Sequence, residues 1–280
     1  MSAKITGLIV TFNSDALIER CVERSFAAGV DRLVIWDNSE DNRTRSVVRS
    51  LNDSRISVGF DGSNHGFGGG VNRAFAMSDR SGLLVMVNPD CEPNRDAIES
   101  MAKLCRDKSV GVVAPRMVYP DGRGGIAGGP RPSILKELLA ATHFDEHLPL
   151  RFRQWLIARF KNPIKAGGSL GETLQAGGPL QVEWVSAFCA MTSAETFLAV
   201  GGMDEEYFLY FEDVDFSLRV SESGLRNFVA RDAAVLHIES ASTGPANKTK
   251  HYWTGYATYL RKRGGFVSVC LAWVLRRRYG

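Results

Sequence analysis

The sequence predicts a single α/β domain built around a mostly parallel sheet, and three observations support this prediction. The chain has 280 residues, 44% hydrophobic and 23% charged, which is typical of a globular protein that buries one substantial core. In its first half, short apolar runs alternate with amphipathic segments, which is the βαβ rhythm of a parallel sheet. The apolar runs are rich in Val, Ile and Leu, as in strands that are covered on both faces.

The first half contains five expected strands with helices between them. The strands are expected at 5–12, 32–37, 56–60, 82–87 and 110–114, and helical patterns begin near Ser14, Asp41, Gly68 and Asn94. Ser14 is expected to cap the first helix at its N-terminus and Gly29 to end it.

The second half is less regular. Residues 120–179 are rich in glycine and proline and contain one helical stretch at 134–160, a pattern typical of loops that face an acceptor. Regular structure then resumes with a strand at 182–192, a helix opened by Ser193, a helix beginning near Glu212, and a strand pair within 226–239.

Charge and cysteine content narrow the class of protein. A net charge of +3 is too small for a dedicated nucleic-acid-binding protein, so no nucleic-acid partner is expected. The five cysteines form no C-x-x-C pair, which argues against a disulfide framework or a structural zinc site and favours a reducing cytoplasmic location. The apolar run near the N-terminus indicates a buried first strand and not a signal peptide.

The C-terminal residues 266–280 combine ten mostly apolar residues with three consecutive arginines. This segment is too short to span a bilayer, which takes about 20 apolar residues. Two interpretations stay open: a helix lying in the interface of an anionic membrane, or a core helix with a solvated basic end.

Polar residues close several of the expected strands. Thr11 and Asn13 follow the first, Asp37 begins the turn after the second, and Asn88 and Asp90 follow the fourth. Ligands bind at the carboxyl ends of strands in open parallel sheets, although each group alone is also ordinary turn chemistry.

A glycine-rich turn at 64–73 precedes a helix and contains Asn64, Gly68 and Asn72. Backbone N–H groups at such a helix start can bind phosphate or sugar oxygens. The turn lacks the G-K-[ST] ending of a P-loop, so this signal is weak.

The densest group of acidic and aromatic residues is at 204–215, and His237 follows after a further helix and strand. Neighbouring carboxylates Glu212, Asp213 and Asp215 point in different directions on a helix, so they need not share one site. Aromatic neighbours would raise a carboxylate pKa by desolvation, which suits a general base; the alternative is an acidic first turn that complements the helix dipole. His237 is a ligand candidate only if the fold brings it to Asp90.

Taken together, IVTFN, WDNS, SNHGFGGGVNRAF, VNPDCEP, GGMDEEYFLYFEDVD and LHIESASTG resemble family 2 glycosyltransferases, especially the rhamnosyltransferase-like and galactofuranosyltransferase-like branch. The resemblance spans about 5–244. It implies a GT-A fold: a Rossmann-like αβα sandwich with a mostly parallel central sheet, here with a C-terminal helical extension. The expected divisions are a nucleotide-sugar-binding half at 1–119, an acceptor-binding and catalytic half of the same domain at 120–244, and a helical segment at 245–280.

The resemblance also implies roles for individual residues. Asp213 matches the catalytic base with Glu212 in support, Asp37 the residue that reads the pyrimidine base, and Asp90 and His237 the metal ligands. The expected donor site comprises Thr11, Asn13, Asp37, Asn64, Gly68, Asn72, Asn88 and Asp90, and the expected acceptor site comprises Trp184 and Asp215. Asn88 stands where the D-x-D metal motif of the family has its first acid.

The implied activity is an inverting, metal-dependent sugar transfer with Mg²⁺ or Mn²⁺ as cofactor. L-Rhamnose from dTDP-rhamnose is the first expected donor and UDP-galactofuranose the second. The expected acceptor is a cell-envelope or lipid-linked glycan at the cytoplasmic face of the membrane, with peripheral membrane contact through 265–280.

Two alternatives come from other classes of protein. The residues at 167–171 satisfy G-x-S-x-G, the nucleophile motif of serine hydrolases, but they lie in a glycine-rich loop without the strand and helix that this motif needs. A non-catalytic nucleotide-sugar or glycan-binding module is the stronger rival, because Asn88 replaces a metal-binding carboxylate.

Overall fold

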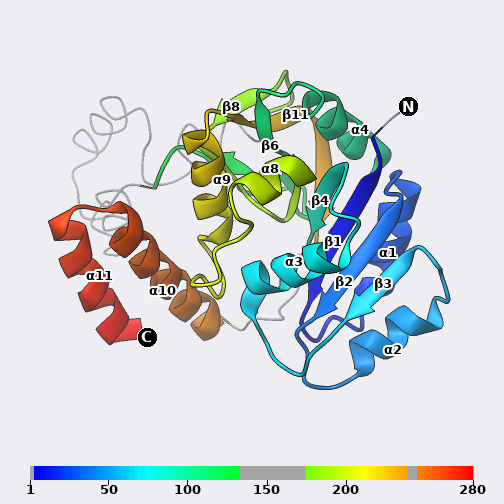
Figure 1. Ribbon diagram of the computed structural model, residues 1–280, viewed down its shortest axis with the longest axis horizontal. Coiled ribbons are helices and arrows are strands. Elements are labelled where there is room, and N and C mark those ends of the chain that lie inside the picture. Colours follow the sequence, from blue (N-terminus) through cyan, green and yellow to red (C-terminus); the bar gives the residue numbers. More distant parts are fainter. Residues whose placement is uncertain (1–2, 133–174, 239–244, 280) are drawn as a thin grey trace.

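A computed structural model describes residues 3–132, 175–238 and 245–279 of the chain. Its main feature is a nine-stranded sheet in the order β3-β2-β1-β4-β10-β6-β11-β5, with β8 paired to β11 (Figure 1). The strands of this sheet are β1 (Ile5–Thr11), β2 (Arg32–Asp37), β3 (Ile56–Gly59), β4 (Leu83–Val87), β5 (Cys91–Glu92), β6 (Val110–Val118), β8 (Leu180–Val182), β10 (Cys189–Ser193) and β11 (Arg226–His237). A two-stranded sheet pairs β7 (Gly128–Gly129) with β9 (Trp184–Val185).

The first four strands are parallel, as the alternating pattern predicts. β1 pairs with β2 on one side and β4 on the other, and Thr11 lies opposite Asp37 in the β1–β2 register. All seven residues of β1 and all five of β4 are buried, which is why these strands are continuous apolar runs. The carboxyl ends of β1 and β2 therefore bring their polar residues to one edge of the sheet.

The described helices are α1 (Ile18–Ala27), α2 (Arg43–Ser50), α3 (Gly66–Met77), α4 (Arg95–Leu104), α8 (Ala194–Ala199), α9 (Glu212–Glu222), α10 (Pro245–Arg263) and α11 (Phe266–Tyr279). Helices α3, α8 and α9 lie in front of the sheet in Figure 1, and α1 lies behind it. This two-sided covering confirms the predicted α/β class with a mostly parallel central sheet.

Helix ends were predicted unevenly. Ser193 opens α8 as expected, and Asn94, near which a helix was expected to begin, caps α4; their side chains accept from Thr196 N–H and Ala97 N–H. The expectation for Ser14 is wrong: its carbonyl accepts from Leu17 N–H and Ile18 N–H in a turn that delays α1 to Ile18.

Two expectations for the second half need correction. The single strand expected at 182–192 is divided into the end of β8, β9 and β10, because the chain moves from one sheet to another. The strand pair expected within 226–239 is one long strand, β11, whose pairing with β6 shifts register between Ala230 and Ala234. The helical stretch expected at 134–160 and the G-x-S-x-G motif at 167–171 lie outside the described residues.

Helix α10 packs between α9 and α11 through a second hydrophobic cluster, separate from the core around the sheet. The buried members of this cluster are Tyr207, Phe211, Val214, Leu218, Tyr256, Ala257, Tyr259, Leu260, Ala272 and Leu275. Figure 1 shows α10 beside α9 and α11 on the far side of α10. Among the described helices, none is long and apolar enough to cross a membrane.

Candidate active site

The carboxyl ends of β1 and β2 are joined by a buried polar network centred on Asp37. One oxygen of this fully buried carboxylate accepts from Thr11 Oγ1 at 2.8 Å and Ser39 Oγ at 2.7 Å, and the other pairs with Arg45 at 2.6 Å. Arg45 is itself only 8% exposed, so the charge of Asp37 is compensated inside the protein. Asp37 thus fixes Thr11 and the 37–39 turn, and the base-reading role stays a prediction.

Asn13 lies at the rim of this network. Its φ of 50° is in the left-handed region, which asparagine tolerates better than most residues, and its N–H donates to Ser39 Oγ at 2.7 Å. The Asn13 side chain is exposed, as a nucleotide-binding role would require.

The glycines of the 64–73 turn have packing reasons that the sequence did not reveal. At Gly66, where φ is 70°, a β-carbon would collide with the Phe208 carbonyl. At Gly70 it would stand 2.5 Å from Val10 of β1, and at Gly68 3.2 Å from Met203 and 3.6 Å from Glu212. The glycines therefore let α3 pack closely between β1 and the 203–212 loop. At Gly68, the position that a β-carbon would occupy faces this loop.

Asn64 and Asn72 also have partners in the protein. The Asn64 side chain accepts from Gly66 N–H at 3.0 Å, which forms the turn before α3. Asn72 accepts from Met203 N–H at 2.8 Å and donates to the Met203 carbonyl at 2.9 Å and to Glu205 at 3.0 Å. Asn72 thus fastens α3 to the 203–205 segment, a structural role that differs from the predicted contact with the donor.

Asp90 and His237, which are far apart in sequence, lie together. Strand β5 follows Asp90 directly and pairs with the end of β11, and His237 Nε2 lies 3.2 Å from Asp90 Oδ1. The other ring nitrogen, Nδ1, is buried without a hydrogen-bond partner among the described residues. The sequence makes His237 a ligand candidate only if the fold brings it to Asp90, and the structure meets this condition.

The chemistry of these side chains fits a divalent cation. One carboxylate oxygen and one imidazole nitrogen are suitable ligands, and Cys91 Sγ lies within the same 4.8 Å group. Burial raises the pKa of the Cys91 thiol well above its usual value. Two protein ligands would leave other coordination positions for ligand oxygens.

Glu212 and Asp213 begin α9 directly after a strained segment. Tyr210 and Phe211 have φ values of 67° and 70°, a conformation that costs side-chain-bearing residues energy. The segment is fastened to α3, because Phe67 N–H donates to the Phe208 carbonyl at 2.9 Å. Strain maintained by its surroundings is a common feature of functional sites.

The two carboxyl groups have different environments. Asp213 accepts from Ala187 N–H at 3.2 Å and from its own helix at Val214 N–H at 2.8 Å, and it is partly exposed. Glu212 is buried, and its Oε2 has no partner among the described residues. Burial raises the pKa of both groups, and the neighbouring Asp213 charge raises that of Glu212 further. Asp213 is thus the accessible carboxylate of the pair.

The loop between β9 and β10 connects the two candidate centres. Ala187 N–H donates to Asp213, and the carbonyl of the next residue, Phe188, accepts from Asn88 N–H at 2.8 Å. The Phe188 ring also lies 6.0 Å from the His237 ring, centroid to centroid. Asn88, His237 and Asp213 therefore surround one short loop, and the structure brings these predicted site residues together.

The two predicted acceptor residues differ in position. Trp184 on β9 is half-buried and donates to the Pro130 carbonyl at 2.8 Å, which leaves its predicted role open. Asp215 is corrected: its carboxylate is 3% exposed and lies between Arg219 at 2.7 Å and Arg263 at 3.0 Å. Both oxygens are paired, so Asp215 joins α9 to α10 and does not face an acceptor.

Arg45 and Arg263 are the important residues that the sequence did not indicate. Arg45 was one of several arginines on an exposed-looking helix, and Arg263 one of three consecutive basic residues. Their roles depend on partners 8 and 48 residues away, for which neither spacing nor composition gives a signal.

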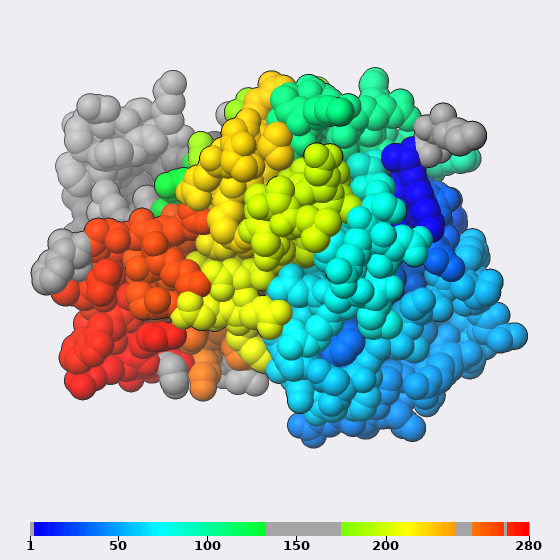
Figure 2. All heavy atoms as spheres, viewed as in Figure 1, coloured from blue at the N-terminus to red at the C-terminus, as the bar shows by residue number. Residues whose placement is uncertain are grey.

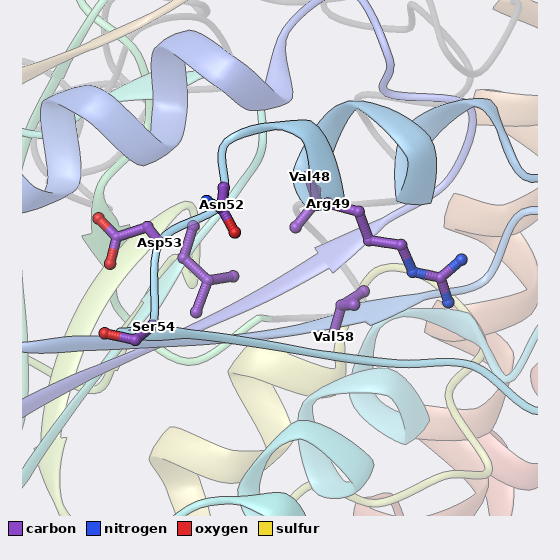
Figure 3. A pocket seen from close by; sticks show the side chains of 7 residues that line it. Val48, Arg49, Asn52, Asp53, Ser54 and Val58 are labelled. Carbon is purple, nitrogen blue, oxygen red and sulfur yellow. The ribbon is translucent and has the colours of Figure 1, made fainter.

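A surface hollow between α2 and β3 is separate from this site (Figure 3). It has a volume of about 300 Å³ and is lined by Val48, Arg49, Asn52, Asp53, Ser54, Ile56 and Val58. It reaches the start of β3, whereas the candidate site is at the carboxyl ends of the parallel strands, and it contains none of the predicted site residues.

Comparisons with known proteins identify the family of the chain. Residues 7–169 match the model of glycosyl transferase family 2. The chain is 26% identical to an N-acetylglucosaminyl-diphospho-decaprenol L-rhamnosyltransferase of Mycobacterium tuberculosis, over 99% of this chain and 90% of that protein. It is 23% identical to a low-salt glycan biosynthesis hexosyltransferase of Haloferax volcanii, over 93% and 74%.

Solved structures share the fold. A mannosyltransferase from Pyrobaculum calidifontis in complex with GDP-Man and Mn²⁺ aligns with a TM-score of 0.61 at 16% identity, over 95% of this chain and 66% of that one. GalNAc-T7 with UDP, GalNAc and Mn²⁺ aligns with a TM-score of 0.60 at 13% identity, over 91% of this chain and 48% of that one. Both of these neighbours are glycosyltransferases that were solved with Mn²⁺ and a nucleotide ligand.

The fold and the site define a GT-A glycosyltransferase. The match over more than half of the chain places this protein in glycosyl transferase family 2.

Proposed function

We propose that this enzyme transfers L-rhamnose from dTDP-rhamnose to a hydroxyl of a cell-envelope or lipid-linked glycan, with inversion at the anomeric carbon. The observation that carries the proposal is the loop at Ala187 and Phe188, which contacts Asp213 on one side and Asn88 on the other. A base and a diphosphate-binding turn so close together are what a displacement on a sugar diphosphate requires. The L-rhamnosyltransferase relative supports the choice of sugar, and the N-acetylglucosaminyl-diphospho-decaprenol in its name supports a lipid-linked acceptor.

In the proposed reaction, Asp213 removes the proton from the acceptor hydroxyl as the hydroxyl oxygen attacks the anomeric carbon. The N–H groups of Ala187 and Val214 fix the orientation of its carboxylate. Burial raises the pKa of Asp213, which makes the carboxylate a stronger base than an exposed aspartate. Glu212, the buried first residue of α9, is proposed to support Asp213 in this role.

Asp90 and His237 are the proposed ligands of Mg²⁺ or Mn²⁺. When bound, the cation supplies Lewis-acid stabilisation of the charge that develops on the departing diphosphate. Thr11, Asn13 and the 37–39 turn are proposed to bind the nucleotide at the neighbouring strand ends. We propose that the sugar transfer takes place at the cytoplasmic face of the membrane, with peripheral contact through 265–280.

The proposal is tested by calorimetric titration of dTDP and UDP into the protein, with and without Mn²⁺. We expect tight binding of dTDP only with metal, and we expect His237→Ala to raise the Mn²⁺ concentration needed for half-maximal binding. The control is His251→Ala, because His251 is on α10, stacked on Phe208, and is not among the residues proposed to bind the metal or the nucleotide. Metal-dependent binding of UDP alone would indicate a UDP-sugar as donor in place of dTDP-rhamnose. Binding of neither nucleotide would overturn the proposal.

A further inference from the structure

Helix α11 has an apolar outer surface at its N-terminal end. Val269, Trp273 and Val274 are 43%, 56% and 51% exposed, and Cys270 beside them is also exposed. On a helix, positions 269, 273 and 270, 274 lie one turn apart on the same side. Large apolar side chains grouped this way, rather than scattered, mark an interaction surface.

The C-terminal end of the same helix is basic. Arg276, Arg277 and Arg278 form its last turn and are exposed, and α11 contains no acidic residue. The Arg277 guanidinium lies 3.9 Å from the centroid of the Trp273 ring, so the basic and apolar parts form one continuous surface. This surface is complementary to a partner that is both apolar and negatively charged.

The opposite face of α11 is used internally. Ser268, Ala272 and Leu275 are buried, and the latter two belong to the cluster that joins α10 to α9. The exposed apolar residues are therefore not the edge of a poorly packed helix. In Figure 2, α11 occupies the end of the molecule opposite to β3 and α2.

We infer that the outer face of α11 docks on an anionic lipid bilayer, with Trp273 and Val274 inserted at the interface and the three arginines on lipid headgroups. Tryptophan is enriched at the level of the headgroups, and clustered arginines bind anionic lipid. The helix has 14 residues, about 21 Å at 1.5 Å per residue, which suits lying in the surface and is too short for crossing. The inference rests on the proposed function, in which the chain makes peripheral contact with a membrane, and it names anionic lipid as the partner. Docking through α11 would bring a lipid-linked acceptor to α9.

Co-sedimentation of the full chain with vesicles tests the inference. We expect binding to vesicles of phosphatidylcholine mixed with phosphatidylglycerol, and little binding to phosphatidylcholine alone. The triple variant Arg276→Gln, Arg277→Gln, Arg278→Gln should lower the partition coefficient by about 10²-fold, since each arginine near an anionic surface contributes about fivefold. The double variant Trp273→Ser, Val274→Ser should also weaken binding, and both changes are on an exposed surface where folding is preserved.

A charge-matched control separates this surface from general electrostatics. The variant Lys103→Gln, Arg106→Gln, Lys108→Gln removes the same charge from an exposed region at the end of α4 and should bind vesicles like the wild type. Equal binding by the two triple variants would overturn the inference. So would a protein dimer in light scattering that the Trp273→Ser, Val274→Ser variant abolishes, because the face would then join two copies.

The vesicle result does not depend on catalysis. Asp213→Asn should bind vesicles normally, so a failure of the proposed sugar transfer and a failure of membrane docking give different results.

Discussion

Gly255 of α10 lies directly against the backbone of Tyr210: a β-carbon at Gly255 would stand 2.5 Å from the Tyr210 carbonyl oxygen. Tyr210 and Phe211 are the two residues with positive φ immediately before Glu212 and Asp213. On its other side, the same loop contacts Gly66 and Phe67 of α3 through Phe208. Helices α3 and α10, which are far apart in the sequence, therefore determine the position of the loop that precedes the proposed base.

The first prediction concerns this contact. Gly255→Ala should lower the free energy of unfolding by about 1–3 kcal/mol, the usual cost of overpacking, and should reduce kcat more than it changes nucleotide affinity. Chemical denaturation and steady-state kinetics measure the two effects. Gly178→Ala is the control, because a β-carbon there meets nothing within 4 Å. Unchanged kcat in Gly255→Ala would show that α10 does not position the base.

The second prediction concerns Asp213 as general base. Asp213→Asn should lower kcat by about 10²-fold or more while calorimetric affinity for the nucleotide stays near that of the wild type. The matched control is Asp96→Asn, an exposed aspartate in the first turn of α4, which should be fully active. An active Asp213→Asn enzyme would exclude the assigned role.

The third prediction concerns pH and the buried Glu212. Its folded pKa is raised above the ordinary value of 4.5, first by burial and then by the Asp213 charge, so the folded state retains the proton more strongly than the unfolded state. Stability from this group is therefore present below pH 4.5 and lost as pH rises towards the folded pKa. Glu212→Gln cannot ionise, so its unfolding free energy should decline less than that of the wild type as pH rises above 4.5.

Urea denaturation of both proteins at a series of pH values measures this difference. Parallel stability curves for the two proteins would contradict the raised pKa of Glu212. Glu99→Gln is a suitable control, since Glu99 is exposed on α4 and its substitution should leave the pH dependence unchanged.

The fourth prediction concerns Asp215 and its two arginines. Asp215→Asn should destabilise the protein by about 3–5 kcal/mol, because it leaves two partly buried guanidinium groups without their carboxylate. Below the unfolding temperature, the KM for the acceptor should change little, since Asp215 faces α10. Glu206→Gln, which breaks the exposed Arg261–Glu206 pair, should cost under about 1 kcal/mol. A large rise in acceptor KM without loss of stability would place Asp215 in the acceptor site, as the sequence predicts.

The sequence predicted the parallel half of the fold well because its information is local. Of the first four strands, β1, β2 and β4 are mostly buried apolar runs followed by turn residues, and the bounds of β2 agree with the prediction to the residue. The junctions in the second half were missed because they depend on distant pairing: β11 continues through a register shift that its partner β6 accommodates. No local pattern distinguishes that irregularity from a turn.

The candidate site was predictable in part for the same reason. Asp90, His237 and Asp213 could be named from motifs, and the structure brings them around one loop. The packing roles of Asn72 and Gly68 could not be foreseen, because Asn72 bonds to Met203, 131 residues away. Polar and small residues are used both for ligands and for close packing, and only the fold shows which use applies.

The position of β10 limits how this enzyme could be divided or recombined. β10 lies between β4 and β6, so a strand from the predicted acceptor half separates two strands of the predicted donor half. A fragment ending at residue 119 would expose an unpaired edge on β4 and leave β6 without either neighbour, an arrangement prone to aggregation. A chimera that joins the first half of one relative to the second half of another must therefore keep β10 complementary to both β4 and β6, because these contacts cross the junction between the halves.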